Sequence, residues 1–580
     1  MSEHTYIKGK DLDLESSIEL MRQKLKLLGV EIDEVSALNP VPFVYSQHIQ
    51  DKLCNLLFTN GKGASQKSCL ASALGEYFER LSCNYFFADY YLGESFAKAE
   101  FVHYPNEKWF TSEEDELPAG LLSDELWHYF DPLDELDAES LVDTNSGALE
   151  RGVCALPFQR QSDNQDIYFP VNIVGNIFVS NGMAAGNTKN EARVQALCEI
   201  FERYVKNKII SEAITLPLIP QNIIERFPHI KKSMDELRLH GYGLRVCDAS
   251  LGGIYPVICV TIINPKDGSV LASFGAHPCF EVAFERTVTE LLQGRSLDML
   301  DDFAQISFNL DEVADNDNLE AHFINSVGLL HYDFFKASPD YEFVDWNYDS
   351  DTFSEFHYLS KLCEDLGAEI YIADYEHLGV YACRILVPSV SDIYPVHDLV
   401  WSNNNEGVFY REALLSLKNL EEEDMLNILE NLENDEHSDM LKVSEFIGVI
   451  ADEGTAWESL QFGELKAMIY LAIGDQKNAK EWVVWSKHMA QLSESRSNLY
   501  RCVDALLDIS LSGRDLSEYE NSLGMIYGVK CVEVSISILN QEEVFYDIPS
   551  PGLSLDGFVK HQDLLKAYTK VHKAKQEFFK

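Results

Sequence analysis

Basic residues are scarce relative to acidic ones in this sequence, and the imbalance argues against several classes of partner. Lysine and arginine number 46 and aspartate and glutamate number 95, which gives the 580 residues a formal net charge of −49. A field of that sign repels phosphate backbones and anionic lipids, so we expect no direct nucleic-acid binding and no membrane association. The same charge suits a basic protein partner or locally held divalent cations, and acidity that only aids solubility explains it equally well at this stage.

Long apolar runs and paired cysteine motifs are also missing. No stretch approaches the roughly 18 apolar residues that a membrane helix needs, and the polar N-terminal stretch lacks the apolar core of a signal peptide. We therefore expect a cytoplasmic protein. The twelve cysteines are scattered without any Cys-x-x-Cys pair, so a zinc ribbon, a thioredoxin-type site and a cluster-binding site have no support.

The common nucleotide and metal motifs are absent as well. The sequence has no complete Gly-x-Gly-x-x-Gly and no His-Glu-x-x-His, and the segment GKGASQKS at 61–68 departs from a P-loop at Gln66, where the second glycine must stand. We expect His377 to be structural rather than a ligand. Any nucleotide or metal site must therefore be built from other residues.

The length of the chain predicts two or more domains, and the secondary-structure signals divide it near residue 405. Before that point strands and helices mix, which predicts an α+β (mixed α/β) domain over 1–405 with an irregular acidic insertion at about 111–150. The expected strands lie at 53–58, before a turn at Asn60-Gly61, and at 168–180, 255–263, 270–275, 369–374 and 380–387. The expected helices lie at 11–29, 68–87 and 280–295.

Strand signals become rare after residue 405. Two helices are expected at 464–489 around Gly474-Asp475, and another at 498–511. The string AIGDQKNAKEWVVWSKHM resembles the turn and second helix of a tetratricopeptide-type repeat, although only one copy is present. These patterns predict a separate α-helical, tetratricopeptide-like association domain over 406–580, and we expect a homodimer formed through it.

A nine-residue segment occurs twice in the first domain. SALGEYFER at 72–80 matches QALCEIFER at 195–203 at six of nine positions, which indicates an internal duplication. At about 100° per residue, the polar positions of each helix fall on one face. These positions are Ser72, Glu76, Glu79 and Arg80 in the first copy, and Glu191, Gln195, Glu199, Glu202 and Arg203 in the second. A third pair, Arg286 and Glu290, has the same i,i+4 spacing.

The repeated acidic faces have a plain explanation and a functional one. A single i,i+4 ion pair stabilises a helix by only about 0.2–0.5 kcal/mol and is common on solvated faces, but solvated pairs need not recur with the same flanking residues. If the five glutamates of the three helices converge, they cannot all ionise without cations. Mg²⁺ takes carboxylate ligands, and nearby arginines suit phosphate oxygens, so the pattern favours a metal-bound nucleotide.

Three motifs stand complete: Ser-x-x-x-Glu-x-x-Glu-Arg at 72–80, Glu-x-x-x-Gln-x-x-x-Glu-x-x-Glu-Arg at 191–203 and Arg-x-x-x-Glu at 286–290. With these motifs the sequence resembles the YcaO family, over essentially the whole chain. The resemblance implies a duplicated domain that binds ATP and Mg²⁺ and phosphorylates an amide oxygen during attack on its carbonyl carbon. By position it assigns Mg²⁺ to Glu76, Glu79, Glu199, Glu202 and Glu290. It assigns ATP to Lys10, Ser17, Arg80, Asn187, Glu191, Gln195, Arg203 and Arg286, of which Lys10 and Ser17 lie outside the motifs. It assigns no further catalytic residue.

The products expected from the family are azolines, thioamides or amidines, but one feature of azoline-forming members is missing. Those members end in Pro-x-Pro-x-Pro, whereas this sequence ends in KQEFFK. The similarity to enterobacterial members instead implies an ATP-using accessory factor in β-methylthiolation of an aspartate of a small-subunit ribosomal protein. A separate radical-SAM methylthiotransferase would perform the radical step. A stand-alone enzyme forming thioamides or azolines and a non-catalytic nucleotide-sensing assembly protein are the alternatives.

Overall fold

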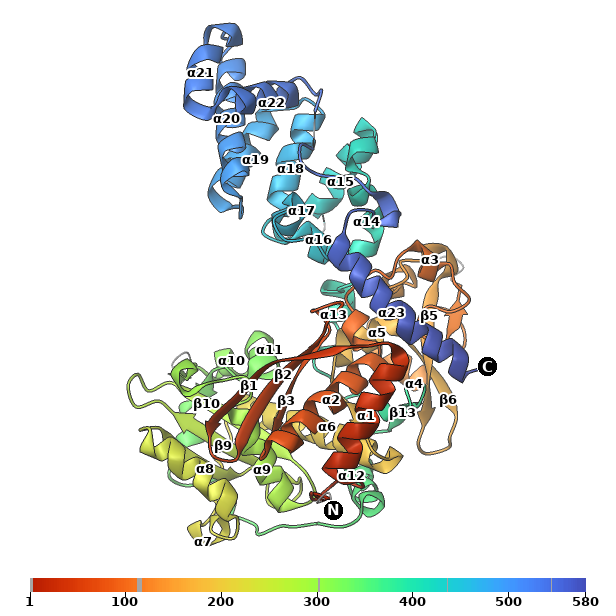
Figure 1. The fold of residues 1–580 in the computed structure, drawn as a ribbon, viewed down its shortest axis with the longest axis vertical. Helices are drawn as coiled ribbons and strands as arrows, with labels where there is room; N and C mark the ends of the chain where they lie inside the picture. The colour runs from red at the N-terminus through yellow and green to blue at the C-terminus, as the bar shows by residue number, and fades with distance from the viewer. Residues whose placement is uncertain (1–3, 112–116, 301–302, 435–436, 544) are drawn as a thin grey trace.

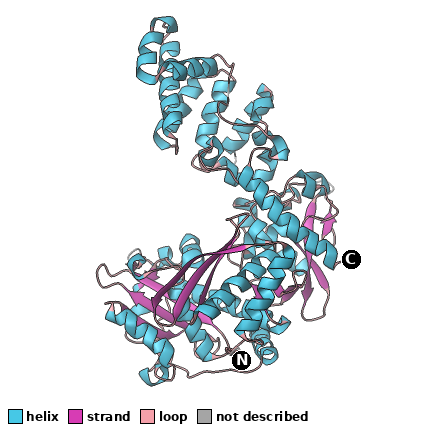
Figure 2. Cartoon of the chain, viewed as in Figure 1, coloured by secondary structure: helices cyan, strands magenta, loops and turns pink. Residues whose placement is uncertain are grey.

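The computed structural model describes residues 4–111, 117–300, 303–434, 437–543 and 545–580. The chain forms a broad part that contains the sheets and a narrower helical arm that extends from it (Figure 1). Figure 2 shows the strands confined to the broad part, and the last strand of the described chain ends at Leu386. The predicted mixed α/β fold followed by a helical region is confirmed. The exact boundary at 405 stays a prediction.

Three antiparallel sheets organise the broad part. The first contains, in order, β1 (Ile32–Val41), β2 (Val44–Asp51) and β3 (Phe58–Gly63). The second has the order β4 (Lys108–Phe110), β5 (Val153–Arg160), β13 (Tyr371–Tyr375), β14 (Tyr381–Leu386) and β7 (Met183–Gly186), with β6 (Asp166–Pro170) also on β5. The third has the order β10 (Val270–Ala276), β9 (Val257–Ile263) and β8 (Gly243–Asp248). A short parallel pair joins β11 (Ile306–Ser307) to β12 (Leu330–His331).

Each of the three larger sheets ends in an edge strand that leads into one motif helix. β3 precedes α2 (Gln66–Ser82), β7 precedes α6 (Lys189–Ser211), and β10 precedes α9 (Phe280–Leu291). The strand and helix of a unit pack closely because of glycine: a Cβ on Gly61 would lie 2.5 Å from the Ala73 nitrogen, and one on Gly186 would lie 2.6 Å from the Ala192 nitrogen. This arrangement brings three helices from distant parts of the sequence to neighbouring sheet edges.

The motif helices begin at well-formed caps and bury one apolar side. Ser65 and Ser68 form a capping box at the start of α2, and the Thr188 hydroxyl accepts a hydrogen bond from the Glu191 nitrogen at the start of α6. The side of α6 opposite its polar face is apolar and fully buried, namely Ala192, Val194, Ala196, Leu197, Ile200 and Phe201. Burying a side chain such as Phe201 stabilises the fold by about 1.5–3 kcal/mol, so the polar face is held in a fixed orientation.

The remaining helices cover the sheets. They are α1 (Leu14–Leu28), α3 (Glu94–Ala97), α4 (Asp124–Phe130), α5 (Val171–Ile173), α7 (Gln221–Ile224), α8 (Pro228–Leu239), α10 (Leu310–Val313), α11 (Asn316–Asn325), α12 (Thr352–Asp365) and α13 (Asp398–Trp401). The acidic insertion is less irregular than expected, since it contains α4 and buries Leu126 and Phe130. Residues 112–116 of the insertion lie outside the described residues.

Three predicted elements in the broad part are wrong. The strand expected at 53–58 is irregular from 53 to 57, with bends and turns, and β3 begins only at Phe58. Asn60 and Gly61 belong to β3, where Gly61 pairs with Gln47, and they form no turn. The segment 168–180 was expected to be strand, but the strand ends at Pro170 and continues as α5 and a π-helix at Val174–Phe178. A short apolar run does not distinguish a buried strand from a buried helix, and this one is buried among core side chains. Val179 then adopts φ 50° and ψ −116°, which costs on the order of 1–3 kcal/mol.

The arm is made of helices, as predicted. They are α14 (Gly407–Leu415), α15 (Glu422–Asn434), α16 (Val443–Phe446), α17 (Ala456–Ser459), α18 (Phe462–Ala472), α19 (Gln476–Met489), α20 (Glu494–Leu511), α21 (Glu520–Tyr527) and α22 (Val529–Leu539). No single helix of the described ranges is long and apolar enough to cross a membrane. Only when α21 and α22 are taken together are they long and apolar enough, and the chain bends by 120° between them.

The final helix, α23 (Val559–Phe578), returns from the arm and packs against the broad part (Figure 1). Lys575 on this helix is completely buried, and its Nζ donates hydrogen bonds to the His103 carbonyl at 2.9 Å and to the Asn84 side chain. His561, nearer the arm, connects the Tyr91 carbonyl with the Ile450 nitrogen. The predicted association region therefore also supplies part of the wall of the first domain.

Candidate functional site

The three motif helices border one cavity of about 1140 Å³. All thirteen residues predicted for the site line it. The predicted metal ligands are Glu76 and Glu79 on α2, Glu199 and Glu202 on α6 and Glu290 on α9; the predicted nucleotide contacts are Lys10, Ser17, Arg80, Asn187, Glu191, Gln195, Arg203 and Arg286. The structure thus brings together residues that lie up to about 280 positions apart, whereas the ligands they bind stay predictions.

The duplicated helices place equivalent ion pairs at one end of the cavity. Glu76 pairs with Arg80 at 2.9 Å, and Glu199 pairs with Arg203 at 2.7 Å. Glu79 lies between these pairs, and burial together with the nearby Glu199 carboxylate raises its pKa well above the usual value. The arginines therefore do not neutralise this end completely, and an added cation would favour the ionised form of Glu79.

Lys62 was missed in the sequence and is the side chain that balances part of this charge. It lies on β3 and forms an ion pair with Glu290. Burial lowers its pKa to about 8, while the carboxylates of Glu202, Glu76 and Glu199 act in the opposite direction. The sequence of the segment NGKG suggests a turn at Asn60-Gly61 and a degenerate P-loop, and neither interpretation points to Lys62. Strand alternation could have found Lys62, because it must face away from its glycine neighbours, which face α2.

A connected polar network forms the other end of the cavity. Glu191 is 3% exposed, and it accepts from Lys10 Nζ at 3.1 Å, from the Asp11 nitrogen at 2.9 Å and from Asn187 Nδ2 at 3.0 Å. Burial alone would raise the pKa of Glu191, but these contacts lower it. Ser17 donates to Asn187 at 2.8 Å. Lys10 and Ser17, predicted outside the motifs, thus join the motif residue Glu191, Lys10 directly and Ser17 through Asn187.

Further polar contacts fix the helices relative to one another. Arg286 Nη1 donates to Gln195 Oε1 at 2.5 Å, which links α9 to α6. Glu202 accepts from the Ala276 nitrogen at 3.3 Å, which links α6 to the end of β10. The Arg80 guanidinium lies 4.7 Å from the centre of the Tyr85 ring. The arrangement is therefore braced before any ligand binds, and it presents carboxylates and guanidinium groups to the same space.

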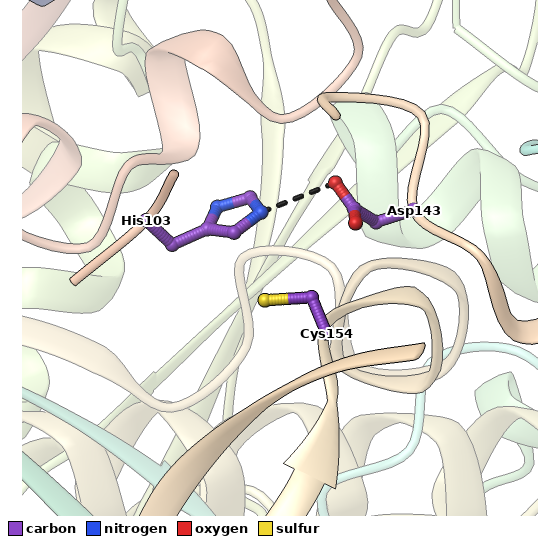
Figure 3. Close-up of side chains that lie close together, drawn as sticks. All are labelled: His103, Asp143 and Cys154. Carbon is purple, nitrogen blue, oxygen red and sulfur yellow. Dashed lines mark hydrogen bonds and ion pairs between the residues drawn. The ribbon is translucent and has the colours of Figure 1, made fainter. Parts of the chain in front are cut away.

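A second group of possible metal ligands lies outside this cavity. Figure 3 shows the His103 ring facing Asp143, with the Cys154 thiol beside them. The distance from His103 Nε2 to Asp143 is 3.1 Å, and all three residues are buried. Asp143 also accepts from the nitrogen and hydroxyl of Ser146. Burial raises the pKa of the Cys154 thiol well above its usual value. The hydrogen bonds of Asp143 to His103 and Ser146 join these side chains in a buried polar network.

His377, which we expect to be structural rather than a ligand, packs near His103, against the neighbouring residue Tyr104. The His377 ring lies edge-on to Tyr104 at 5.9 Å and to Tyr375 at 6.1 Å, and it is 8% exposed. It does not line the cavity that contains the motif residues. Its surroundings are those of a packed aromatic residue, and burial lowers its pKa well below the ordinary histidine value.

Comparison with known families and proteins gives matches over nearly the whole chain. A family model described as YcaO cyclodehydratase, ATP- and Mg²⁺-binding, matches residues 60–391, and one described as YcaO cyclodehydratase C-terminal domain matches 407–577. The ribosomal protein S12 methylthiotransferase accessory factor YcaO of Escherichia coli K12 is 51% identical over 581 residues, covering 99% of both chains. An uncharacterized protein of Haemophilus influenzae is 50% identical over 587 residues, covering 100% of both.

Solved structures give weaker matches. A heterocyclase in complex with substrate and cofactor has a TM-score of 0.43 and 17% identity, over 69% of this chain and 57% of the heterocyclase. The YcaO protein of Methanopyrus kandleri bound with AMPPCP and Mg²⁺ has a TM-score of 0.39 and 16% identity, over 67% of this chain and 95% of that protein.

Proposed function

This chain belongs to the YcaO family, whose members bind ATP and Mg²⁺, and we propose that its motif-helix cavity binds ATP with Mg²⁺. The observation that carries the proposal is the convergence of five glutamates and three arginines from three helices on one cavity. Carboxylate oxygens are the ligands that Mg²⁺ prefers, and planar guanidinium groups match phosphate oxygens.

The residues of the cavity fit such a ligand in their chemistry. Glu76, Glu79, Glu199, Glu202 and Glu290 would hold Mg²⁺, which when bound would neutralise charge on the phosphate oxygens. The raised pKa of Glu79 indicates that this end of the cavity can accept more positive charge. Arg80, Arg203 and Arg286 would contact phosphates beside the metal. Lys10, Ser17, Asn187, Glu191 and Gln195 would contact the rest of the nucleotide, because they lie at the other end or between the two ends.

The role of the nucleotide is a second part of the proposal. We propose that the chain acts as an accessory factor for a separate methylthiotransferase, which modifies an aspartate of a ribosomal protein of the S12 kind. ATP would activate an amide or carboxyl oxygen of the substrate by phosphorylation. The name and 51% identity of the E. coli relative support the process, and the net charge of −49 suits a basic substrate. A cytoplasmic location would follow from this role.

A stand-alone peptide-modifying enzyme is the second candidate function. It is favoured by the description of the matching family model as a cyclodehydratase. The two candidates differ in their effect on the ribosome. Deleting the gene and measuring the mass of ribosomal protein S12 should show loss of the methylthio group if the first is correct. An unchanged mass would contradict the accessory role and leave the second.

Nucleotide binding is tested directly by Glu199→Gln in the full-length chain. We expect ATP affinity in the presence of Mg²⁺ to fall about 100-fold, because a carboxylate of the cluster is replaced by a neutral amide. Calorimetric titration measures the affinity with and without Mg²⁺. Glu212→Gln is the matched control, since Glu212 follows the same helix and pairs only with Lys208 on the surface. Equal affinities for the two variants would refute the assignment.

The homodimer is also part of the proposal. On α21 and α22 the side chains of Met525, Ile526 and Val529 are 82%, 64% and 67% exposed. Contiguous apolar exposure of this kind often marks an interface. Light scattering should give twice the chain mass for the wild type and the mass of a single chain for Ile526→Lys. A wild type that is monomeric at all concentrations would exclude the dimer.

A further inference from the structure

A second and larger cavity, of about 2070 Å³, lies between the broad part and the helical arm. On one side its lining includes residues between Cys83 and Asp89, residues of the π-helix and Val179 after it; on the other it includes residues of α14, α15 and α16. Tyr85 lines both this cavity and the motif-helix cavity. The two cavities therefore adjoin at Tyr85, whose ring is covered by the site residue Arg80.

The larger cavity carries an excess of negative charge. Its carboxylates are Asp89, Glu406, Glu412, Asp424 and Glu445. Arg384 is the only lysine or arginine among the described residues that line it, and this side chain is 93% buried with Nη2 donating to the carbonyls of Val174 and Val179. Its guanidinium is thus committed to the protein backbone. Such a surface attracts a cationic ligand and repels nucleic acid.

One face of α15 offers polar groups to the cavity. Asp424, Asn427, Asn431 and Asn434 follow the three- and four-residue spacing of a single helix face, and all four line the cavity and are exposed. The side-chain amides of Asn427 and Asn431 form no hydrogen bond with another described residue. A side-chain amide both donates and accepts, so a row of them can bind the N–H and C=O groups of an extended polypeptide.

Two large aromatic side chains are exposed on the same walls. Trp401, at the end of α13, is 71% exposed, and Phe409 on α14 is 48% exposed. Large apolar side chains exposed within a polar cavity are suited to contact apolar groups of a ligand. The volume is about twice the upper end of the usual range for small-molecule sites, which is roughly 1,000 Å³. A polypeptide segment fits this size and this mixture of charge, amide and aromatic groups.

The wall of the larger cavity that lies nearest the motif-helix cavity has a backbone conformation that is rare in proteins. The π-helix at Val174–Phe178 is followed by Val179 at positive φ, and Val174, Gly175, Asn176 and Val179 line the larger cavity. The next residue, Ser180, lines the motif-helix cavity. Single π-helical turns and strained residues are found preferentially at functional sites. The segment therefore marks the border between the cavities as functional.

We propose that the larger cavity binds an extended, basic segment of the polypeptide substrate and that this segment reaches the nucleotide past Tyr85. This proposal rests on the proposed function, because it takes ATP with Mg²⁺ as the ligand of the adjoining motif-helix cavity. It adds the location of the polypeptide and the residues that recognise it. Asp424, Asn427 and Asn431 contact the segment, and Trp401 and Phe409 hold its apolar groups.

The test measures binding of fluorescently labelled ribosomal protein S12 to the full-length chain, together with calorimetric titration of ATP with Mg²⁺. We expect S12 to be basic, because a ribosomal protein lies against RNA phosphates. The double variant Asn427→Lys, Asn431→Lys places two positive charges in the cavity. Glu430→Lys is the matched control, because it changes the net charge by the same amount on an exposed position of α15 that does not line the cavity.

We expect the double variant to weaken S12 binding about tenfold or more, while Glu430→Lys stays within about twofold of the wild type. Both variants should bind ATP with the wild-type affinity, which also verifies their folding. Equal S12 affinities for the double variant and the control would overturn the proposal. A wild type that binds ATP but not S12 would overturn it as well, while leaving the nucleotide site intact. If Glu199→Gln loses ATP binding while the double variant keeps it and loses S12 binding, both the nucleotide site and the polypeptide site are supported, each by its own variant.

Discussion

The two cavities on either side of Tyr85 are built in different ways. The first is lined by three motif helices that each follow an edge strand, and its polar and charged side chains already bond to one another, as Arg286 does to Gln195 and Lys10 to Glu191. The second is enclosed by two halves of the chain, and the side chains of Asn427 and Asn431 on its wall form no hydrogen bond with another described residue. A braced site suits one fixed ligand, whereas a site with uncommitted groups suits a variable one.

The comparison predicts that changes at the first cavity leave the second unaffected. Arg286→Met should reduce ATP affinity about 100-fold, or roughly 2.7 kcal/mol, because it removes a phosphate contact and the bond to Gln195. S12 binding should not change. Calorimetry and fluorescence anisotropy measure the two affinities, with Lys208→Met on the exposed end of α6 as the control. A parallel loss of S12 binding would show that the cavities are one site.

The second cavity should instead depend on how α23 docks. Lys575→Met keeps much of the side-chain volume but leaves the His103 carbonyl and the Asn84 side chain without their buried donor. Such losses cost about 1–3 kcal/mol each. We expect a lower midpoint of urea unfolding and weaker S12 binding, with ATP affinity nearly unchanged because no contact to the motif helices is removed. Equal loss of both affinities would instead place Lys575 in support of the whole broad part.

A smaller effect is expected from pH through His561, which connects both halves. Burial lowers its pKa to about 4, so in the folded protein it stays neutral where an ordinary histidine takes up a proton. The unfolded chain binds more protons between pH 6.5 and pH 4, and stability is therefore lost as pH falls through that range. Between pH 7 and pH 5.5 the loss is about 1 kcal/mol. His561→Gln should remove this part of the dependence, measured by urea unfolding at both pH values; an identical dependence would assign it to other groups.

The difference between the two cavities also explains which parts of the fold and the site could be predicted from the sequence. Glu76, Glu79, Glu199 and Glu202 could be predicted because the side chains that share a helix face follow a fixed spacing, and Glu290 because it has the same i,i+4 spacing to Arg286. Lys62 could not be predicted from a comparison with the P-loop motif. It becomes visible only when Gly61, Lys62 and Gly63 are treated as alternating positions of a strand. The π-helix at Val174–Phe178 was not found because an apolar run carries no period that separates a buried helix from a strand.

The second cavity had no local signal of any kind. Its walls depend on contacts such as those from Asn145 to the carbonyls of Phe87 and Tyr90, more than 50 positions away, and from Arg411 to Thr144, 267 positions away. Neither spacing nor composition reports which distant segments meet. The helical arm could be predicted from its pattern, but the return of α23 to the broad part could not, because its apolar side would fit any partner surface.

The return of α23 also sets an order of events during synthesis. Lys575 bonds to Asn84, 491 positions earlier, so at about 5–20 residues per second a ribosome needs roughly 25–100 s to make the second partner after the first. Throughout that interval the three motif helices can emerge and pair with their strands, while Phe87, which packs against Tyr568 of α23 at 4.8 Å, stays uncovered. A chain interrupted before α23 would carry every nucleotide-site residue and still expose the apolar surface that chaperones and proteases recognise.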